Sequence, residues 1–371
     1  MEDMTGLEVR TSRGVTRIRF CRSLSGLGAG ARRDEHLLVD ARVAQLYARP
    51  LRRALASRSV LRIEATERNK SLEALPRFAR HLIERGVRRD HRLVAVGGGV
   101  VLEIAAFLAG TLLRGVRWRC YPTTLLAQAD ACIGGKSSLN VGPYKNQLGT
   151  VTPPQEVVVS PELLDTLPEM EFRSGLGEVI KAHILSGSAA VRWLSRNLGG
   201  LRGDRGLLER AILTSLKVKK RAVEADEFDL RERMLLNYGH TFGHALEAAS
   251  GFHIPHGIVV TVGMEMANRL SERLGLADKT VVDELSLLLD VNLGGFRLPR
   301  FSTDRFFSAL MRDKKGSSRG LRLVLLREPG RLVVREVPFD RRLRGFCGEY
   351  FRARWAPAAL RRSGKRSGAS R

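Results

Sequence analysis

The sequence predicts an α/β domain with a largely parallel sheet, followed by a mostly α-helical domain. Three observations support this fold class. Strand-like and helix-like segments alternate between residues 36 and 120, three glycines join one of these strands to a helix, and helical periodicity dominates after about residue 160. Alternation of this kind is typical of a parallel sheet whose strands are connected by helices.

Each segment of the first half carries its own signal. Short apolar runs predict strands, and apolar residues three and four positions apart predict helices. The expected order is strand 36–40 (HLLVD), helix 41–55, strand 60–65 (VLRIEA), helix 71–86, strand 93–97 (LVAVG), buried helix 100–115 and strand 117–124 (RWRCYPTT).

The second half is helical in period over residues 161–185, 207–227 and 235–251, and LRLVLLREPGRLVVREV at 321–337 is the main exception, resembling a hairpin. We therefore expect three parts. Residues 1–166 form the α/β domain, 167–350 form the helical domain, and 351–371 form a basic tail rich in Ser and Gly that is expected to be disordered.

The composition favours a cytoplasmic two-domain protein. The chain has 371 residues, of which 43% are hydrophobic, and it has no apolar run long enough for a membrane span or a secretory signal. The cysteines form no CxxC pair, which argues against a disulfide framework or a cysteine zinc site. They are Cys21, Cys120, Cys132 and Cys347.

The net charge of +24, from 63 Lys and Arg against 39 Asp and Glu, raises the question of a nucleic-acid partner. The excess is mostly arginine spread along the whole chain, and aromatic residues make up only 6%. No single basic face interleaved with aromatic residues is visible, so the sequence argues against nucleic-acid binding. A few of these charges could serve an anionic substrate.

The glycine run of residues 97–99 lies between a predicted strand and a predicted helix. Consecutive glycines allow a pyrophosphate to approach the backbone at a helix N-terminus. The alternative is a tight turn without a ligand, because Leu102 breaks the GxGxxG spacing. A Rossmann-like dinucleotide site therefore stays open on this motif alone.

A polar string, TTLLAQADACIGGKSSLNVGPYKNQLGT, occupies residues 123–150. It contains Asp130, Lys136, Asn140, Lys145 and Asn146 among glycines. Lysines beside exposed backbone amides suit the binding of oxyanions. A solvated loop is the alternative, but a polar loop of this length is more often functional.

Four of the eight histidines lie within NYGHTFGHALEAASGFHIPHG, residues 237–257. His240 and His244 are one helical turn apart, and a loop could return His256 to the same point. Two imidazoles and a carboxylate suit catalytic zinc, and Glu178 is a candidate for the carboxylate. Paired histidines without a metal are the alternative. Thr241 follows His240, so the HExxH motif of zinc proteases is absent.

Taken together, the motifs resemble those of 3-dehydroquinate synthase, a family of sugar phosphate cyclases. The matching segments follow the family's order over roughly residues 36–330. They are GGGVVLEIAAFLAGTLLRGVRW, YPTTLLAQADACIGGKSSLN, YKNQLGT, DTLPEMEFRSGLGEVIK, ADEFDLRERMLLNYGHTFGHALE and PHG. The resemblance implies an NAD-binding α/β domain, a helical domain, a divalent zinc or cobalt ion and a homodimer.

The resemblance also assigns roles to residues. Glu178, His240 and His256 resemble the metal ligands, His244 resembles a substrate or proton-transfer residue, and His253 matches no functional position. The implied substrate-contacting set is Asp130, Lys136, Lys145, Asn146, Lys181, Lys219, Arg233 and Asn237, with Lys314 or Lys315 reaching the phosphate and Arg114 entering the partner subunit's site. The implied NAD-binding set is Asp40, Glu67, Lys70, Gly98, Gly99, Glu103, Thr123, Thr124, Lys136, Lys145, Thr166 and Leu167.

The reaction implied by the resemblance belongs to the shikimate pathway. A seven-carbon sugar acid phosphate is oxidised transiently by NAD⁺, and the new ketone acidifies the adjacent C–H so that phosphate leaves. Reduction, ring opening and an intramolecular aldol step then close a carbocycle. The metal would polarise the reacting oxygen, while cations hold the carboxylate and the phosphate.

Three positions depart from the family's usual pattern. Glu103 stands where Asp is usual, Arg42 where Asn is frequent, and Ile258 where Glu usually follows PHG. Lys219 and Arg233, the cations on the carboxylate side, are both present. We therefore expect 3-deoxy-D-arabino-heptulosonate 7-phosphate as the substrate. The alternatives are a cyclase for a sugar phosphate without a carboxylate, such as sedoheptulose 7-phosphate, and a metal-dependent alcohol or polyol dehydrogenase of related fold.

Overall fold

The computed structural model describes residues 6–21, 32–142, 144–229, 232–312 and 320–355. By their internal contacts the residues form two compact units, Met1–Leu236 and Asn237–Arg371. Residues 167–236 belong to the first of these two units, and their helices pack against its strands and short helices. The expected domain boundary at residues 166 and 167 stays a prediction.

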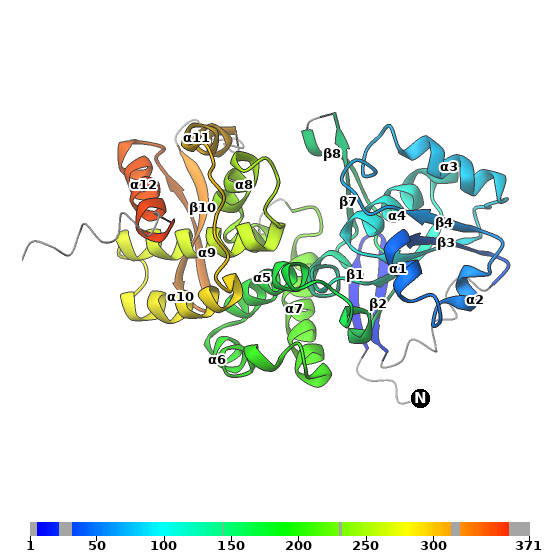
Figure 1. The fold of residues 1–371 in the computed structure, drawn as a ribbon, viewed down its shortest axis with the longest axis horizontal. Coiled ribbons are helices and arrows are strands. Elements are labelled where there is room, and N and C mark those ends of the chain that lie inside the picture. The colour runs from blue at the N-terminus through cyan, green and yellow to red at the C-terminus, as the bar shows by residue number, and fades with distance from the viewer. Residues whose placement is uncertain (1–5, 22–31, 143, 230–231, 313–319, 356–371) are drawn as a thin grey trace, which may run out of the picture. The chain divides into compact units, whose positions relative to one another are not determined.

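A seven-stranded sheet forms the centre of the first unit, in the order β1-β2-β9-β6-β5-β3-β4 (Figure 1). Every neighbouring pair is parallel except β1 and β2, so the largely parallel sheet that the sequence predicts is confirmed. The strands are β1 (Leu7–Thr11), β2 (Gly14–Phe20), β3 (Glu35–Asp40), β4 (Val60–Ile63), β5 (Arg92–Gly97), β6 (Arg117–Pro122) and β9 (Glu156–Val159).

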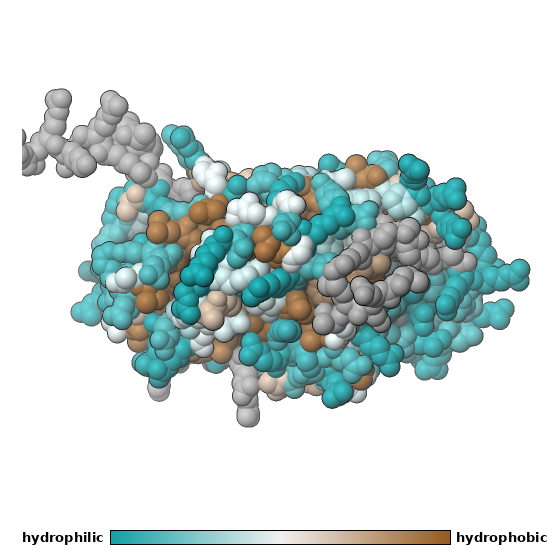
Figure 2. Space-filling view, turned by 90° about the horizontal axis from the view of Figure 1, so that it is seen from below, coloured by the Kyte–Doolittle hydropathy of each residue, from teal (hydrophilic) through white to brown (hydrophobic). Residues whose placement is uncertain are grey.

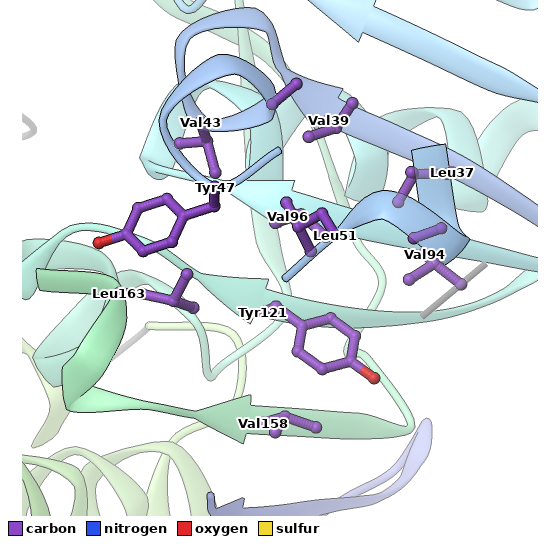
Figure 3. Packing of buried hydrophobic residues seen from close by; sticks show 12 residues of the cluster. Leu37, Val39, Val43, Tyr47, Leu51, Val94, Val96, Tyr121, Val158 and Leu163 are labelled. Atoms are coloured by element: carbon purple, nitrogen blue, oxygen red, sulfur yellow. The ribbon is translucent and has the colours of Figure 1, made fainter. Parts of the chain in front are cut away.

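Strands β3, β5 and β9 contain continuous apolar runs at residues 37–39, 93–96 and 157–159, because parallel strands are covered on both faces. Figure 3 shows one side of this core, where Val39, Val96 and Val158 lie near Tyr47 and Leu163. The helices between the strands are α1 (Ala41–Leu46), α2 (Arg52–Leu55), α3 (Leu75–Glu84) and α4 (Gly99–Thr111). Helix α4 is apolar on nearly all sides, as a fully buried helix must be.

The polar string of residues 123–150 is not a loop. It contains a short π-helix, η3 (Ala127–Ala131), and an antiparallel hairpin of β7 (Lys136–Val141) and β8 (Tyr144–Val151). The hairpin packs on α4, and Ser137, Leu139 and Asn140 are buried. Its strand pattern was hidden in the sequence because serine, asparagine and lysine replace the usual alternation of apolar and polar residues.

Three long helices complete the first unit. They are α5 (Glu169–Ser186), α6 (Ser188–Asn197) and α7 (Arg205–Ala225). Asp204 caps α7, since its side chain accepts hydrogen bonds from the backbone N–H groups of Gly206 and Leu207. Short 3-10 segments lie at η2 (Leu112–Arg114), η4 (Pro161–Leu164), η5 (Leu198–Gly200) and η6 (Glu232–Asn237).

The second unit is mostly helical, as predicted, and contains the predicted late hairpin. Its elements are α8 (His240–Ala249), α9 (His256–Arg273), α10 (Lys279–Leu293), α11 (Thr303–Arg312), β10 (Leu321–Glu328), β11 (Arg331–Val337) and α12 (Arg341–Trp355). Helix α9 is buried continuously from Gly257 to Asn268 and packs against α8, α10 and β10. Because α12 runs to Trp355, the expectation of a disordered tail from residue 351 is wrong for residues 351–355. The rest of that tail lies outside the described residues.

Helices α8 and α9 approach closely because three glycines lie at their contact. A Cβ atom on Gly263 would lie 1.9 Å from the carbonyl oxygen of Gly239, and one on Gly243 would lie 2.9 Å from that of Val259. Gly239 itself has a φ of 79°, a left-handed conformation that favours glycine. Side chains at these positions would force the two helices apart.

We therefore predict that Gly263→Ala destabilises the protein by about 2–3 kcal/mol or more, because overpacking against backbone cannot be relieved by rotating a side chain. Urea unfolding followed by circular dichroism measures the change. Gly345→Ala is the matched control, since Gly345 lies on α12 and a Cβ there meets no atom within 4 Å. Equal stability of the two variants would contradict the close contact of α8 with α9.

Candidate functional site

Three histidines of the second unit form a cluster that could hold a metal ion. The candidate ligand nitrogens of His240, His244 and His256 all lie within 4.8 Å of one another. The ring centroids of His240 and His244 are 5.2 Å apart, and those of His240 and His256 are 5.3 Å apart. His253, which matched no functional position, is exposed on the loop between α8 and α9. The predicted convergence of His240, His244 and His256 is therefore confirmed.

The helices explain why these rings meet. His240 and His244 lie one turn apart on α8, and His256 is the first residue of α9. The glycine contacts bring the start of α9 beside α8. His244 also belongs to the cluster, so in addition to the proton-transfer role implied by the resemblance it could act as a third imidazole ligand.

Two neighbouring groups orient the imidazoles. The Nδ1 atom of His240 lies 3.2 Å from the carbonyl oxygen of Tyr238, and because a carbonyl only accepts, Nδ1 carries the proton. The basic nitrogen of His240 is then Nε2. The Nδ1 atom of His256 lies 4.0 Å from a carboxylate oxygen of Glu247, one turn beyond His244 on α8. Metal-binding histidines commonly have a carbonyl or carboxylate behind them in this way.

Glu178 belongs to the first unit, where it lies on α5. Its carboxylate and the ammonium of Lys181 are 2.5 Å apart, and both side chains are almost fully buried. A buried cation offsets part of the cost of burying a carboxylate, and carboxylates are common ligands for divalent ions.

A second group of predicted residues surrounds η3 and β7 in the first unit. The ammonium of Lys219, on α7, lies 2.9 Å from the carboxylate of Asp130 and donates a hydrogen bond to the Asp130 carbonyl oxygen. Lys136 pairs with Asp229 at 2.6 Å. Arg233 is buried and donates to the carbonyl oxygen of Glu227.

Two cations of this group, Lys219 and Arg233, are buried, and carboxylates lie beside both. Burial lowers the pKa of the Arg233 guanidinium from its usual value, although nearby carboxylates, Asp229 and Asp130 first among them, oppose the effect. Burial also lowers the pKa of Lys136, and the charges of Arg233 and Lys219 contribute to that shift. Cations that destabilise one another are stabilised by a bound anion.

A third group centres on Lys70. Its ammonium lies 3.1 Å from the carboxylate of Glu103 and donates to the side-chain oxygen of Asn146 at 2.9 Å. Glu67 accepts a hydrogen bond from Asn140 at 2.8 Å. The structure thus brings together Lys70, Glu67, Glu103 and Asn146. It adds Ser138, whose hydroxyl donates to Glu103 at 2.6 Å and which sequence reasoning missed because the hairpin was not expected.

The glycine turn lies at the carboxyl end of β5. Gly98 precedes α4, and Thr123 follows the adjacent strand β6, where its N–H donates to the Gly97 carbonyl oxygen at 3.0 Å. A Cβ on Gly98 would lie 2.9 Å from the methyl carbon of Thr124. Gly99 opens onto free space, because a Cβ there would meet nothing within 4 Å. This edge of a parallel sheet is where nucleotides bind in such folds.

Asp40 lies at the same edge, at the end of β3. Its carboxylate caps α1 by accepting a hydrogen bond from the backbone N–H of Arg42 at 2.8 Å. Thr166 donates to the hydroxyl of Tyr47 at 3.1 Å, and Leu167 is buried. Arg42, which departs from the usual pattern of the family, therefore contributes only its backbone N–H to this cap. Ile258, a second such departure, is fully buried in α9.

Asn237, Lys145 and Arg114 are the remaining predicted residues that the structure describes. Asn237 is exposed, Lys145 lies on β8, and Arg114 is exposed with a φ of 64°. Lys314 and Lys315 lie outside the described residues. Within the part of the chain that the structure describes, no helix combines the length and the apolar character needed to cross a membrane.

Comparison with known proteins identifies the chain's relatives. Two family models match adjoining segments: 3-dehydroquinate synthase N-terminal over residues 60–174 and 3-dehydroquinate synthase C-terminal over residues 175–316. A 3-dehydroquinate synthase of Dictyoglomus thermophilum is 37% identical over 286 residues, which cover 76% of this chain and 80% of that protein.

Two solved structures are similar over almost the whole chain. A 2-deoxy-scyllo-inosose synthase complexed with carbaglucose-6-phosphate, NAD⁺ and Co²⁺ has a TM-score of 0.80 at 23% identity and covers 94% of this chain and 100% of that one. A 2-epi-5-epi-valiolone synthase from Streptomyces hygroscopicus with NAD⁺ and Zn²⁺ bound has a TM-score of 0.79 at 25% identity and covers 90% of this chain and 95% of that one.

The buried pair on α5 yields a stability prediction. Lys181→Met removes the ammonium beside the buried Glu178 carboxylate, and we expect a loss of about 3–5 kcal/mol in the free energy of unfolding. Urea unfolding in the presence of a chelator measures it. The double variant Glu178→Gln, Lys181→Met should recover most of the loss, because no buried charge remains. A loss below about 1 kcal/mol in the single variant would show that the two groups do not form an ion pair.

Proposed function

The chain belongs to the 3-dehydroquinate synthase family, and we propose that it converts 3-deoxy-D-arabino-heptulosonate 7-phosphate to 3-dehydroquinate and phosphate with the residues described above. The chain is an enzyme with 3-dehydroquinate synthase activity, a carbon–oxygen lyase of the shikimate pathway. The roles of individual residues, the cofactors and the assembly are our proposal.

We propose that one divalent ion, zinc or cobalt, binds to His240, His256 and Glu178. The three clustered imidazoles support this, because nitrogen donors with one carboxylate are a preferred ligand set of both ions. When bound, the ion would polarise an oxygen of the substrate. His244, whose imidazole lies beside those of His240 and His256, is placed to hold or move a proton, as the family motif implies.

We propose that NAD⁺ binds at the carboxyl edge of the sheet. The glycines before α4 fit a pyrophosphate, since Gly99 leaves open space and a side chain at Gly98 would meet Thr124. NAD⁺ when bound would accept and return a hydride. Lys70 and Glu103 would contact the dinucleotide with their neighbours. The proposed set is Asp40, Glu67, Lys70, Gly98, Gly99, Glu103, Thr123, Thr124, Lys136, Lys145, Thr166 and Leu167.

The choice of substrate rests on the buried cations around η3. Lys219 and Arg233 are buried, and Arg233 has a lowered pKa, so a carboxylate entering between them would gain strong charge-assisted hydrogen bonds. A sugar phosphate without a carboxylate would not form these hydrogen bonds. We assign contacts with the substrate to Asp130, Lys136, Lys145, Asn146, Lys181, Lys219, Arg233, Asn237 and Lys314.

We further propose that the enzyme works in the cytoplasm as a homodimer, with Arg114 reaching the partner's site. Cys120, Cys132 and Cys347 are buried thiols outside any disulfide, which fits a reducing compartment. Leu113 and Arg114 both have positive φ values, so the backbone here is held in a conformation unusual for such residues. Unusual conformations of this kind occur where function requires a defined side-chain direction.

The test is a phosphate-release assay on purified protein with NAD⁺ and zinc or cobalt. We expect release from 3-deoxy-D-arabino-heptulosonate 7-phosphate and none from sedoheptulose 7-phosphate or glucose 6-phosphate. Chelation should reduce the rate at least about 100-fold, and added metal should restore it.

Absorbance of NADH, followed in the same reaction, separates the alternatives. A cyclase regenerates NAD⁺, so we expect no accumulation. Release of phosphate only from a sugar without a carboxylate would refute the proposed substrate. Steady accumulation of NADH would instead identify a dehydrogenase.

A further inference from the structure

A basic pocket lies in the first unit, between α5, α6, α7 and β1. It has a volume of about 680 Å³, within the range of small-molecule sites. Leu7, Ala189 and Ala190 provide apolar walls. The residues of the pocket belong to none of the three groups proposed above, so the site requires its own explanation.

The charged lining of this pocket is entirely basic. Arg210, Lys217 and Arg221 follow one another at helical spacing along a single face of α7, and Lys220 lies beside them. Lys220 also pairs with Glu224, which leaves the other three cations as the dominant charges. Figure 2 views the side of the molecule where α6 and α7 lie in Figure 1, and it shows hydrophilic side chains with hydrophobic residues between them.

The floor of the pocket contains a buried acceptor. His183 is fully buried, and its Nδ1 donates to the carbonyl oxygen of Val179 at 2.8 Å. Burial lowers the pKa of His183 to about 4, so the ring is neutral and Nε2 is an acceptor. Among the described residues, Nε2 has no hydrogen-bond partner. A buried acceptor of this kind is stabilised when a donor reaches it.

Trp193 lies over this acceptor. Its indole stacks on the His183 ring with centroids 5.9 Å apart, and the guanidinium of Arg210 lies 4.5 Å from the indole centroid. Trp193 is only partly buried and lines the same pocket, so a ligand bound beside it would change its fluorescence. The stack thus links the cationic face of α7 to the acceptor on α5.

From these observations we propose that the pocket binds a small organic anion. The ligand carries a phosphate or carboxylate for Lys217 and Arg221, an apolar body for the alanine and leucine walls, and an O–H or N–H group for His183. The pocket adjoins α5 and α7, which carry Lys181 and Lys219 elsewhere on their surfaces.

The test uses 4-hydroxyphenyl phosphate and 4-hydroxybenzoate as probes, each with a phenolic O–H for His183, and inorganic phosphate and benzyl alcohol as the charge-only and body-only comparisons. Titration is followed by tryptophan fluorescence and by calorimetry. We expect both aromatic anions to bind and to change the fluorescence, the stronger one identifying phosphate or carboxylate as the preferred group. Benzyl alcohol should not bind measurably.

Variants locate the binding. Lys217→Ala with Arg221→Ala should weaken binding at least about tenfold, since two charge-assisted contacts are lost. Both residues are exposed, so the fold should be retained. Arg205→Ala is the matched control, because Arg205 is a cation on the same helix that pairs with Asp165 away from the pocket. The affinity of the Arg205→Ala variant for the two aromatic anions should equal that of the unsubstituted chain.

Trp193→Phe retains an aromatic ring, and the fluorescence change should disappear although calorimetric binding remains. A fluorescence change that persists in Trp193→Phe, unchanged affinity in the Lys217 and Arg221 variant, or no binding by the unsubstituted chain would each overturn the proposal. None of these outcomes depends on whether the chain has the cyclase activity.

Discussion

The contact between α8 and α9 is the constraint on which the histidine cluster depends. Gly239, Gly243 and Gly263 let the backbones approach so closely that a single Cβ atom would clash with a carbonyl oxygen. Because His240 begins α8 and His256 begins α9, this approach places their rings together. The glycines therefore position the histidine rings without contributing a side chain of their own. Glycine at such positions is required by packing, which a composition count cannot reveal.

In the first unit, the sheet brings several of the predicted site residues together. Its parallel strands end at one edge, and the glycine turn, Asp40 and Thr123 gather there because they follow strands that are neighbours in the sheet. The long helices α5 and α7 carry buried cations, Lys181 and Lys219, each beside a carboxylate. Partial neutralisation of this kind keeps cations charged inside a protein while leaving them able to bind an anion. The cationic face of α7 at the basic pocket, formed by Arg210, Lys217 and Arg221, is instead exposed.

The sequence was sufficient for the features whose physics is local. Glycines after an apolar run predicted the turn at Gly98, and the i, i+4 spacing predicted that His240 and His244 share a face. Features that depend on distant partners were not predictable. The hairpin of β7 and β8 is stabilised by packing on α4, and so Ser138 was overlooked as a partner of Glu103. The helix that continues to Trp355 was missed because its arginines resembled a disordered tail. The basic pocket was missed because its residues are separated by up to about two hundred positions, from Leu7 to Arg221.

The central claim is that imidazoles of α8 and α9 bind one divalent ion. X-ray absorption at the cobalt edge, measured on protein loaded with one equivalent of Co²⁺, tests it most directly. The account predicts at least two imidazole nitrogens around the ion, and their loss in the His240→Ala, His256→Ala variant. A spectrum with oxygen ligands only, or one that is the same in that variant, would contradict the account.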